Sequence, residues 1–332
     1  MHTRGVRRPW LVPLAALLAA SGCADRDTMA PAAPEAVPER GVMAGPGPYL
    51  ADPAQSLGPT AAVSADLAVG QPAGLLWQHR RLGRRVRWTL SATGGYTGIA
   101  AELRNTPAPY SIAAVADFNR DGHPDLAWEN TDTGARSIWR MLGAYWPTHS
   151  SPLPTQPIDW HIAAAADFDR DGFDDIVWQN RTTGERKIWL MNGAAWDGRE
   201  AALRTVPAYW DIAGAGDFDR DGSPDLVWQH TVSGERVIWL MDGAAWRGRQ
   251  AIVRTVGTYW DIAAVGDVDG DGGPDLVWQH RSNGERVIWL MDGTAWRGRQ
   301  VVLPTVPREW EIVGLMGISI TGPAPTATTG AA

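Results

Sequence analysis

A single cysteine, few phenylalanines and tyrosines, and a shortage of positive charge set the first limits on this sequence. One Cys among 332 residues excludes an intramolecular disulfide framework and any cysteine-based zinc site. A formal net charge of −7 argues against a nucleic-acid-binding surface, so no nucleic-acid partner is expected. Four Phe and six Tyr stand against 19 Trp, which suggests one motif copied several times. The 37 Gly and 24 Pro argue against a mainly helical chain.

Motifs of the common enzyme classes are also missing. The sequence has no Gly-rich phosphate loop, no G-x-S-x-G elbow and no H-E-x-x-H motif. His79, His230 and His280 share one position of a repeat, where other copies have Asn130 and Asn180, and a residue that recurs in this way is expected to cap a strand. We therefore predict a protein that is not an enzyme. An extracytoplasmic carbohydrate-active hydrolase or lyase is the alternative.

The amino-terminal residues have the pattern of an export signal. Three arginines precede the apolar stretch 10–20, which is shorter than the ~20 residues of a membrane span. Small residues then lead to Cys23 in a segment that resembles the lipobox of bacterial lipoproteins, with Ala20 where that family usually has Leu. The resemblance implies a signal peptide over residues 1–22 and lipidation of Cys23. An ordinary secretory signal is the alternative.

Composition predicts what surrounds the folded part of the chain. Residues 23–62 hold seven prolines among Ala and Gly, a composition typical of an extended, disordered tether. Residues 320–332 are rich in Thr, Ala and Pro and are expected to be a disordered tail. The lipoprotein resemblance implies a protein anchored to the bacterial outer membrane by lipid alone, and no Asp follows Cys23 to retain it at the inner membrane. A secreted protein is the alternative to this anchoring. We also expect the protein to be a monomer.

Residues 63–319 repeat with a period of fifty residues. The segment Asp217–Gly222 (DFDRDG) recurs in related form at Asp117–Gly122, Asp167–Gly172 and Asp267–Gly272. The tryptophans fall into the same register, and one column of them is Trp128, Trp178, Trp228 and Trp278. The repeat accounts for every Trp except Trp10.

Each copy predicts four short strands. In the copy that begins at Trp210 they span residues 210–216, 225–230, 236–241 and 249–255. The second and third strands are apolar on both faces, so neighbouring sheets must cover them. The chain holds five such hairpins and a final strand over 310–318 without one. This predicts an all-β, five-bladed propeller whose ring is closed by the carboxy-terminal strand. Six blades or an open stack are the alternatives.

The strongest chemical signal is an acidic loop after the first strand of four copies. Carboxylate or amide side chains stand at positions 1, 3, 5 and 9, Gly at position 6 permits a sharp turn, and position 7 would offer a backbone carbonyl. All-oxygen donors favour Ca²⁺, and about four sites are predicted. An EF-hand is excluded because a Trp stands at position 12; an Asp-rich turn without metal is the alternative. The predicted ligands are Asp117, Asn119, Asp121, His123, Asp125; Asp167, Asp169, Asp171, Phe173, Asp175; Asp217, Asp219, Asp221, Ser223, Asp225; and Asp267, Asp269, Asp271, Gly273, Asp275.

The segment GDFDRDGSPDLVWQ (216–229) resembles the FG-GAP or VCBS-type repeat of bacterial surface proteins and of the integrin α-subunit propeller. The resemblance covers roughly residues 66–318. It implies that calcium stabilises the loops, away from the main ligand surface. The first copy has Gly70–Gly74 in place of the acidic loop, so no metal is expected there, and Asn119 weakens the next site.

The opposite end of the propeller is the predicted ligand surface. The strand directions place the hairpin turns and the connections between copies there, with an aromatic residue in each: Tyr110, Trp160, Trp210, Trp260 and Trp310. Aromatic rings beside Asp, Gln and Arg suit sugar rings, which have an apolar face and hydroxyl edges. The alternative is that these tryptophans only pack between blades. We predict a binding or adhesion module for a glycan or protein ligand.

Overall fold

A computed structural model of the protein describes residues 73–106, 108–142 and 146–316. The predicted signal peptide, Cys23, the tether and the tail lie outside the described residues. The described residues contain twenty β-strands and no helix long and apolar enough to cross a membrane. The prediction of an all-β fold is therefore confirmed.

The strands form five antiparallel sheets of four strands each. One sheet, blade A, combines β20 (Trp310–Met316) with β1 (Gly74–His79), β2 (Arg85–Leu90) and β3 (Tyr96–Leu103). Blade B contains β4 (Tyr110–Ala116), β5 (Asp125–Asn130), β6 (Arg136–Leu142) and β7 (Trp146–Leu153). Blade C contains β8 (Trp160–Ala166), β9 (Asp175–Asn180), β10 (Arg186–Asn192) and β11 (Ala195–Leu203). Blade D contains β12 (Trp210–Gly216), β13 (Asp225–His230), β14 (Glu235–Asp242) and β15 (Ala245–Thr255). Blade E contains β16 (Trp260–Gly266), β17 (Asp275–His280), β18 (Arg286–Asp292) and β19 (Ala295–Leu303).

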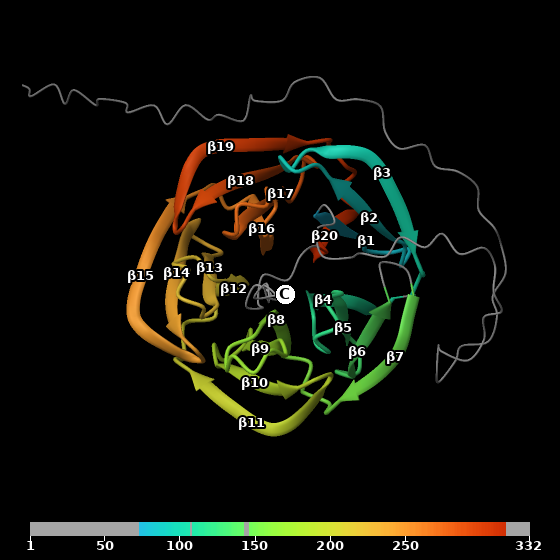
Figure 1. The fold of residues 1–332 in the computed structure, drawn as a ribbon, viewed down its shortest axis with the longest axis vertical. Coiled ribbons are helices and arrows are strands. Elements are labelled where there is room, and N and C mark those ends of the chain that lie inside the picture. Colours follow the sequence, from blue (N-terminus) through green and yellow to red (C-terminus); the bar gives the residue numbers. More distant parts are fainter. Residues whose placement is uncertain (1–72, 107, 143–145, 317–332) are drawn as a thin grey trace, which may run out of the picture. The chain divides into compact units, whose positions relative to one another are not determined.

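The five sheets surround a central axis as the blades of a propeller (Figure 1). The first strand of each repeat lies innermost, and the fourth strand, such as β11 or β15, forms the rim (Figure 1). Neighbouring innermost strands contact one another around the whole ring, from β4 through β8, β12 and β16 to β20 and back to β4. Five blades are therefore present, as predicted.

The carboxy-terminal strand closes the ring. Strand β20 pairs antiparallel with β1, with Leu315 opposite Leu75 and Trp310 opposite His79. The alternatives of six blades and an open stack are thereby wrong. β20 thus occupies the innermost place in blade A.

The strand boundaries follow the predictions closely, except at the rim. In blade D the first two strands span the predicted residues, whereas the fourth begins at Ala245 instead of Arg249. The extra residues are held by aromatic stacking, because the ring centroid of Trp246 lies 4.6 Å from that of Trp239 at an interplanar angle of 23°. The stack brings the rim strand back against the third strand directly after the turn.

A buried arginine on the third strand joins each blade to the next. The Arg186 guanidinium carbon lies 5.2 Å from the centre of the Trp228 ring, which is fully buried in the following blade. The same guanidinium donates to the backbone carbonyl of Trp210, the first residue of that blade. Cation–π contacts of this kind are strongest when water is excluded. Equivalent pairs occur at every junction: Arg85 with Trp128, Arg136 with Trp178, Arg236 with Trp278, and Arg286 with Trp77.

A glutamine on the second strand forms a parallel link. Gln179 Oε1 accepts a hydrogen bond from the backbone N–H of Ile212 in the next blade at 3.0 Å. Glu129 replaces this glutamine in blade B and accepts from Ile162 N. The sequence predicts Gln and Arg side chains beside an open aromatic surface, and this prediction is wrong for Gln179 and Arg186, because both are buried in the blade junctions.

Candidate functional site

Four acidic loops lie at one end of the axis, each between the first and second strands of a blade. In the loop of blade D, Arg220 at position 4 has a φ of 58° and Gly222 at position 6 a φ of 85°. Two left-handed residues so close together curl the chain tightly, and glycine adopts this region without steric cost. The other three loops have left-handed residues at the same two positions.

The aspartate at position 1 organises the loop around its own carboxylate. Asp217 Oδ1 accepts the N–H of Asp221 at 3.1 Å, and Oδ2 accepts the N–H of Gly222 at 2.8 Å. The carboxylate of Asp221 in turn accepts the N–H of Ser223, the position-7 residue, at 2.8 Å. The same position-7 N–H contact is made by His123, Phe173 and Gly273. The carboxylates at positions 1 and 5 and the backbone between them are therefore held in one compact turn.

The aspartate at position 9 has a structural role that the sequence did not reveal. Asp225 is fully buried, and its Oδ1 accepts the N–H of Met241 on β14 while its Oδ2 accepts the N–H of Phe218 in the loop. The carboxylate thus ties the loop to the third strand. Burial raises the pKa of this group to about 6 in Asp225 and Asp275, and to about 7 in Asp125 and Asp175.

Three of the loops gather acids closely enough to hold a metal ion. One oxygen from each member of a trio lies within 4.8 Å of the others in Asp167–Asp169–Asp175, Asp217–Asp219–Asp225 and Asp267–Asp269–Asp271. The loop of blade B is not among these trios, and there Asn119 stands at position 3. Two buried oxygens, Asp125 Oδ2 and Asp269 Oδ1, have no hydrogen-bond partner among the described residues. Oxygen donors without partners fit a hard cation.

Arginines from the rim strands also reach these carboxylates, and they were not predicted. Arg247 on β15 lies 3.4 Å from Asp219 and contacts Asp221. Arg297 on β19 lies 3.8 Å from Asp269 and contacts Asp271. In the sequence each arginine directly follows a Trp of the repeat. This recurrent position was the one signal by which the sequence could have indicated these arginines. The guanidinium groups supply positive charge to the same oxygens that a cation would use.

The other two loops deviate from this arrangement. In blade C the residue after the repeat Trp is Asp197, and Arg199 instead lies 3.0 Å from Asp169. In blade B that position is Pro147, and the loop uses Asn119, whose amide donates to Asp121 at 2.9 Å. The loop of blade B therefore has one carboxylate fewer, and Asp121 receives a hydrogen bond from an amide where Asp221 and Asp271 contact an arginine.

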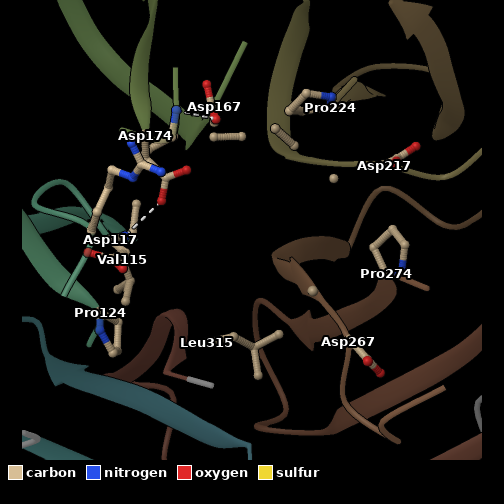
Figure 2. A pocket seen from close by; sticks show the side chains of 18 of the residues that line it. Val115, Asp117, Pro124, Asp167, Asp174, Asp217, Pro224, Asp267, Pro274 and Leu315 are labelled. Atoms are coloured by element: carbon tan, nitrogen blue, oxygen red, sulfur yellow. Dashed lines mark hydrogen bonds between the residues drawn. The ribbon is translucent and has the colours of Figure 1, made fainter. Parts of the chain in front are cut away.

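The loops surround the mouth of a cavity of about 580 Å³ on the axis. Figure 2 shows Asp117, Asp167, Asp217 and Asp267 around it, with Leu315 of β20 at the side of blade A. Asp174 lines the same cavity at a position where the other copies have Pro. Its buried carboxylate accepts the N–H of Asp117 in blade B at 2.7 Å, and burial raises its pKa to about 7.

The predicted aromatic residues lie at the opposite end, at the first position of each innermost strand. Trp160, Trp210, Trp260 and Trp310 are half-buried, and Tyr110 is 41% exposed. Trp260 meets the ring of His280 edge-on, with centroids 5.0 Å apart. Each Trp thus packs partly on the core and leaves part of its ring open.

The recurrent histidines cap the hairpin turns, as predicted. His230 Nδ1 accepts the N–H groups of Val232 and Ser233 at 3.2 and 3.0 Å. Asn180 does the same in blade C through Oδ1, which accepts from Thr182 and Thr183. The two side chains are interchangeable because each offers one acceptor at the start of a turn.

Comparison with known proteins identifies the repeat. A family model described as FG-GAP-like repeat matches three overlapping windows, residues 117–178, 167–228 and 217–278. A search of curated proteins finds no relative.

Solved structures match the chain only distantly. A crystal structure of a nidogen/laminin complex is 13% identical with a TM-score of 0.41, covering 73% of this chain and 97% of that chain. A structure of an Agrocybe aegerita lectin that recognises non-reducing terminal N-acetylglucosamine is 16% identical with a TM-score of 0.39, covering 76% and 72%. A putative 6-phosphogluconolactonase from Bacteroides uniformis is 13% identical with a TM-score of 0.36, covering 72% and 85%.

Proposed function

Because this protein is a five-bladed β-propeller of FG-GAP-like repeats, we propose that it is a calcium-stabilised, non-enzymatic binding or adhesion module. The observation that carries the proposal is the division of the propeller into two chemically different ends. One end gathers carboxylates into trios, and the other presents recurrent aromatic rings. Four-stranded sheets connect the two ends, so metal ions could order the loops at one end while a ligand binds at the other.

Calcium would be held by the three acid trios, with a fourth, weaker site in the loop of blade B. The carboxylates of one trio repel one another, and the trio around Asp267 includes a buried oxygen that accepts no hydrogen bond among the described residues. A bound divalent ion would supply the charge that stabilises the ionised form of these acids. The position-7 residues would add backbone carbonyls, as the repeat resemblance implies.

The calcium proposal is tested by melting the protein with excess EDTA and with calcium, and by calorimetric titration of the chelated protein. Binding to the folded state alone stabilises it by RT ln(1 + [L]/Kd), roughly 2.7 kcal/mol per site at a hundredfold excess over Kd. We expect a higher Tm with calcium and about three to four bound ions. Equal melting curves and no heat of binding would contradict the proposal.

The ligand surface is proposed at the aromatic end. Tyr209 and Tyr259, which precede Trp210 and Trp260, are 46% and 65% exposed. Asp211 directly follows Trp210 on β12 and has no side-chain hydrogen bond within the described part of the chain, whereas the equivalent Asp261 accepts two from Arg281 at 2.6 Å. A carboxylate that accepts no hydrogen bond among the described residues, next in the chain to an aromatic residue, suits the hydroxyl edge and apolar face of a sugar. The proposed ligand class is therefore a glycan, with a protein ligand as the second candidate.

A glycan array probed with the purified protein tests this surface. We expect binding that is lost in the double variant Tyr209→Ala/Tyr259→Ala. Ile252→Ala serves as the matched control, because Ile252 is also 65% exposed but lies on the rim strand β15. Loss of binding in the control, or binding unchanged in the double variant, would place the ligand elsewhere.

Anchoring to the bacterial envelope is proposed from the lipobox-like segment that ends at Cys23. A lipid on this residue, followed by the Pro-rich tether, would hold a monomeric propeller away from the membrane surface. Metabolic labelling with a fatty acid tests the proposal. We expect label in the membrane fraction of the natural protein and none in Cys23→Ser, which should be released as a soluble protein.

An enzyme remains the second candidate because one acid breaks the repeat inside the central cavity. Asp174 replaces a proline there, although its carboxylate already serves as an acceptor for Asp117 N–H. Turnover of a polysaccharide that is abolished in Asp174→Asn but retained in Asp211→Asn would favour this candidate over the binding module. Absence of turnover across a polysaccharide panel supports the binding module.

A further inference from the structure

Three arginines, one in each of the loops of blades B, C and D, connect that acidic loop to the loop of the next blade. Arg120 Nη1 donates to the carbonyl oxygen of Asp171 at 2.9 Å, and Arg170 Nε donates to that of Gly222 at 3.0 Å. Arg220 Nη2 lies 3.4 Å from the carbonyl oxygen of Asp271. All three arginines stand at position 4 of their own loops. The contacts therefore run in one direction, from blade B through C and D to E.

The backbone at position 4 is strained where an arginine is present. Arg120, Arg170 and Arg220 have φ values of 60°, 61° and 58°, a left-handed region that side chains with a Cβ rarely occupy. The last loop has Gly270 at this position, with a φ of 77°. Blade A follows that loop, and its strands β20 and β1 come from opposite ends of the described chain, so no loop joins them there. The arginine is thus replaced by the unstrained residue at the one loop that has no acidic loop after it.

Each arginine also contacts the position-7 residue of the next loop. The Arg120 guanidinium lies 5.5 Å from the ring centre of Phe173, and Arg170 contacts Ser223 Oγ. Gly273 faces Arg220 so closely that a Cβ there would lie 2.9 Å from Nη2. Position 7 is the residue whose backbone carbonyl is a predicted ligand. The position-7 residues of the last three loops differ accordingly: a ring faces Arg120, a hydroxyl contacts Arg170, and a glycine leaves room for Arg220.

We propose that the loops bind cations as a coupled series in which each arginine holds the ligand-bearing turn of the next loop. This inference rests on the proposed calcium binding. A cation that orders one loop fixes the backbone from which its arginine extends. The arginine then restricts the next loop before an ion arrives, so less ordering remains for the second ion to bring about. Coupling of this kind makes binding cooperative without any change of fold.

The central experiment compares the natural protein with Arg170→Gly by calorimetric calcium titration and by hydrogen exchange. Glycine at position 4 already occurs in the loop of blade E, so the variant is expected to fold. We expect a Hill coefficient above one in the natural protein and a value nearer to one in Arg170→Gly, with about fivefold weaker binding at the loop of blade D. In the chelated protein, amides of residues 221–223 should exchange faster in the variant, while those of residues 271–273 stay unchanged.

Two further variants separate geometry from charge. Arg170→Lys keeps the positive charge but loses the planar fork, and it is expected to behave like Arg170→Gly. Arg308→Gly removes an exposed arginine at the opposite end and should leave the titration unchanged. Independent sites in the natural protein, or full cooperativity in Arg170→Gly, would overturn the coupling and leave calcium binding intact. A natural protein that binds no calcium would overturn the proposed function and the inference together.

Discussion

The guanidinium carbon of Arg286 lies 5.5 Å from the ring centre of Trp77, and Arg286 Nη2 donates to the carbonyl of Trp310 at 2.8 Å. These contacts join blade E to both halves of blade A, which come from opposite ends of the described chain. Burial removes water from the arginine and lowers its pKa to about 10, which leaves it charged at neutral pH. The junction that closes the ring thus uses the same arginine–tryptophan contact as the other four blade junctions.

Replacing this arginine tests how much the closure contributes. Arg286→Ala removes a desolvated cation–π contact and leaves the Trp310 carbonyl without its donor, so we expect a loss of about 2–4 kcal/mol in the free energy of unfolding. Urea denaturation measures the loss. Arg299→Ala, at an exposed position of β19, should change the stability by less than about 0.5 kcal/mol. An effect of that small size in Arg286→Ala would show that closure depends on strand pairing alone.

Removing the closing strand has a different expected outcome. Deletion of residues 310–332 leaves β1 as an unpaired edge lined by Leu75 and Trp77, which are buried in the intact ring. Open strand edges with apolar side chains associate with one another. Size-exclusion chromatography should show oligomers or aggregate in place of a monomer. A monomeric deletion variant with an unchanged melting curve would contradict the role assigned to β20.

The buried position-9 aspartates predict an unusual pH dependence. Their pKa values of about 6 to 7 exceed the unfolded value of about 3.9, so between these values the folded protein binds protons that the unfolded chain has lost. The ion-free protein should therefore lose stability as the pH rises from about 4 to about 7. Calcium binds the ionised carboxylates, so its stabilising effect should grow over the same range. Melting curves with EDTA and with calcium at several pH values measure both trends, and a chelated protein that gains stability with rising pH would contradict the first.

The rim arginines predict a competition with calcium. Arg297→Gln removes a positive charge that contacts Asp271 and lies close to Asp269, so the loop of blade E should bind calcium about two- to fivefold more tightly. The ion-free variant should melt at a lower temperature. Calorimetric titration and melting check the two effects. Weaker binding in the variant would show that the arginine supports the site instead of competing for it.

Much of the fold could be predicted because its signals are local and repeated. The Trp columns, the acidic turns and the β-branched runs defined the strands of blade D to within a few residues, except where Trp246 extends β15. Ring closure could also be predicted, since Trp310 begins a first strand that has no hairpin after it.

The candidate site was less predictable because its contacts cross between blades. Acids lie close together in three of the four loops where clusters were predicted, but the second role of Asp225 depends on Met241, which lies on another strand. Gln and Arg side chains were predicted beside the aromatic rings, but the sequence alone could not show that Arg186 and Gln179 lie in a blade junction. Only the three-dimensional register shows that they face Trp228 and Ile212.

The pairing of β20 with β1 has a consequence for biosynthesis. A hairpin that emerges among the first residues of the propeller must keep one edge open while the ribosome adds more than two hundred residues, because its partner begins at Trp310. Blades B to E can each form as soon as their own four strands have been made. The sheet that is translated first is therefore the last to be completed. Any chain whose synthesis stops before Trp310 keeps the same unpaired, apolar side of β1.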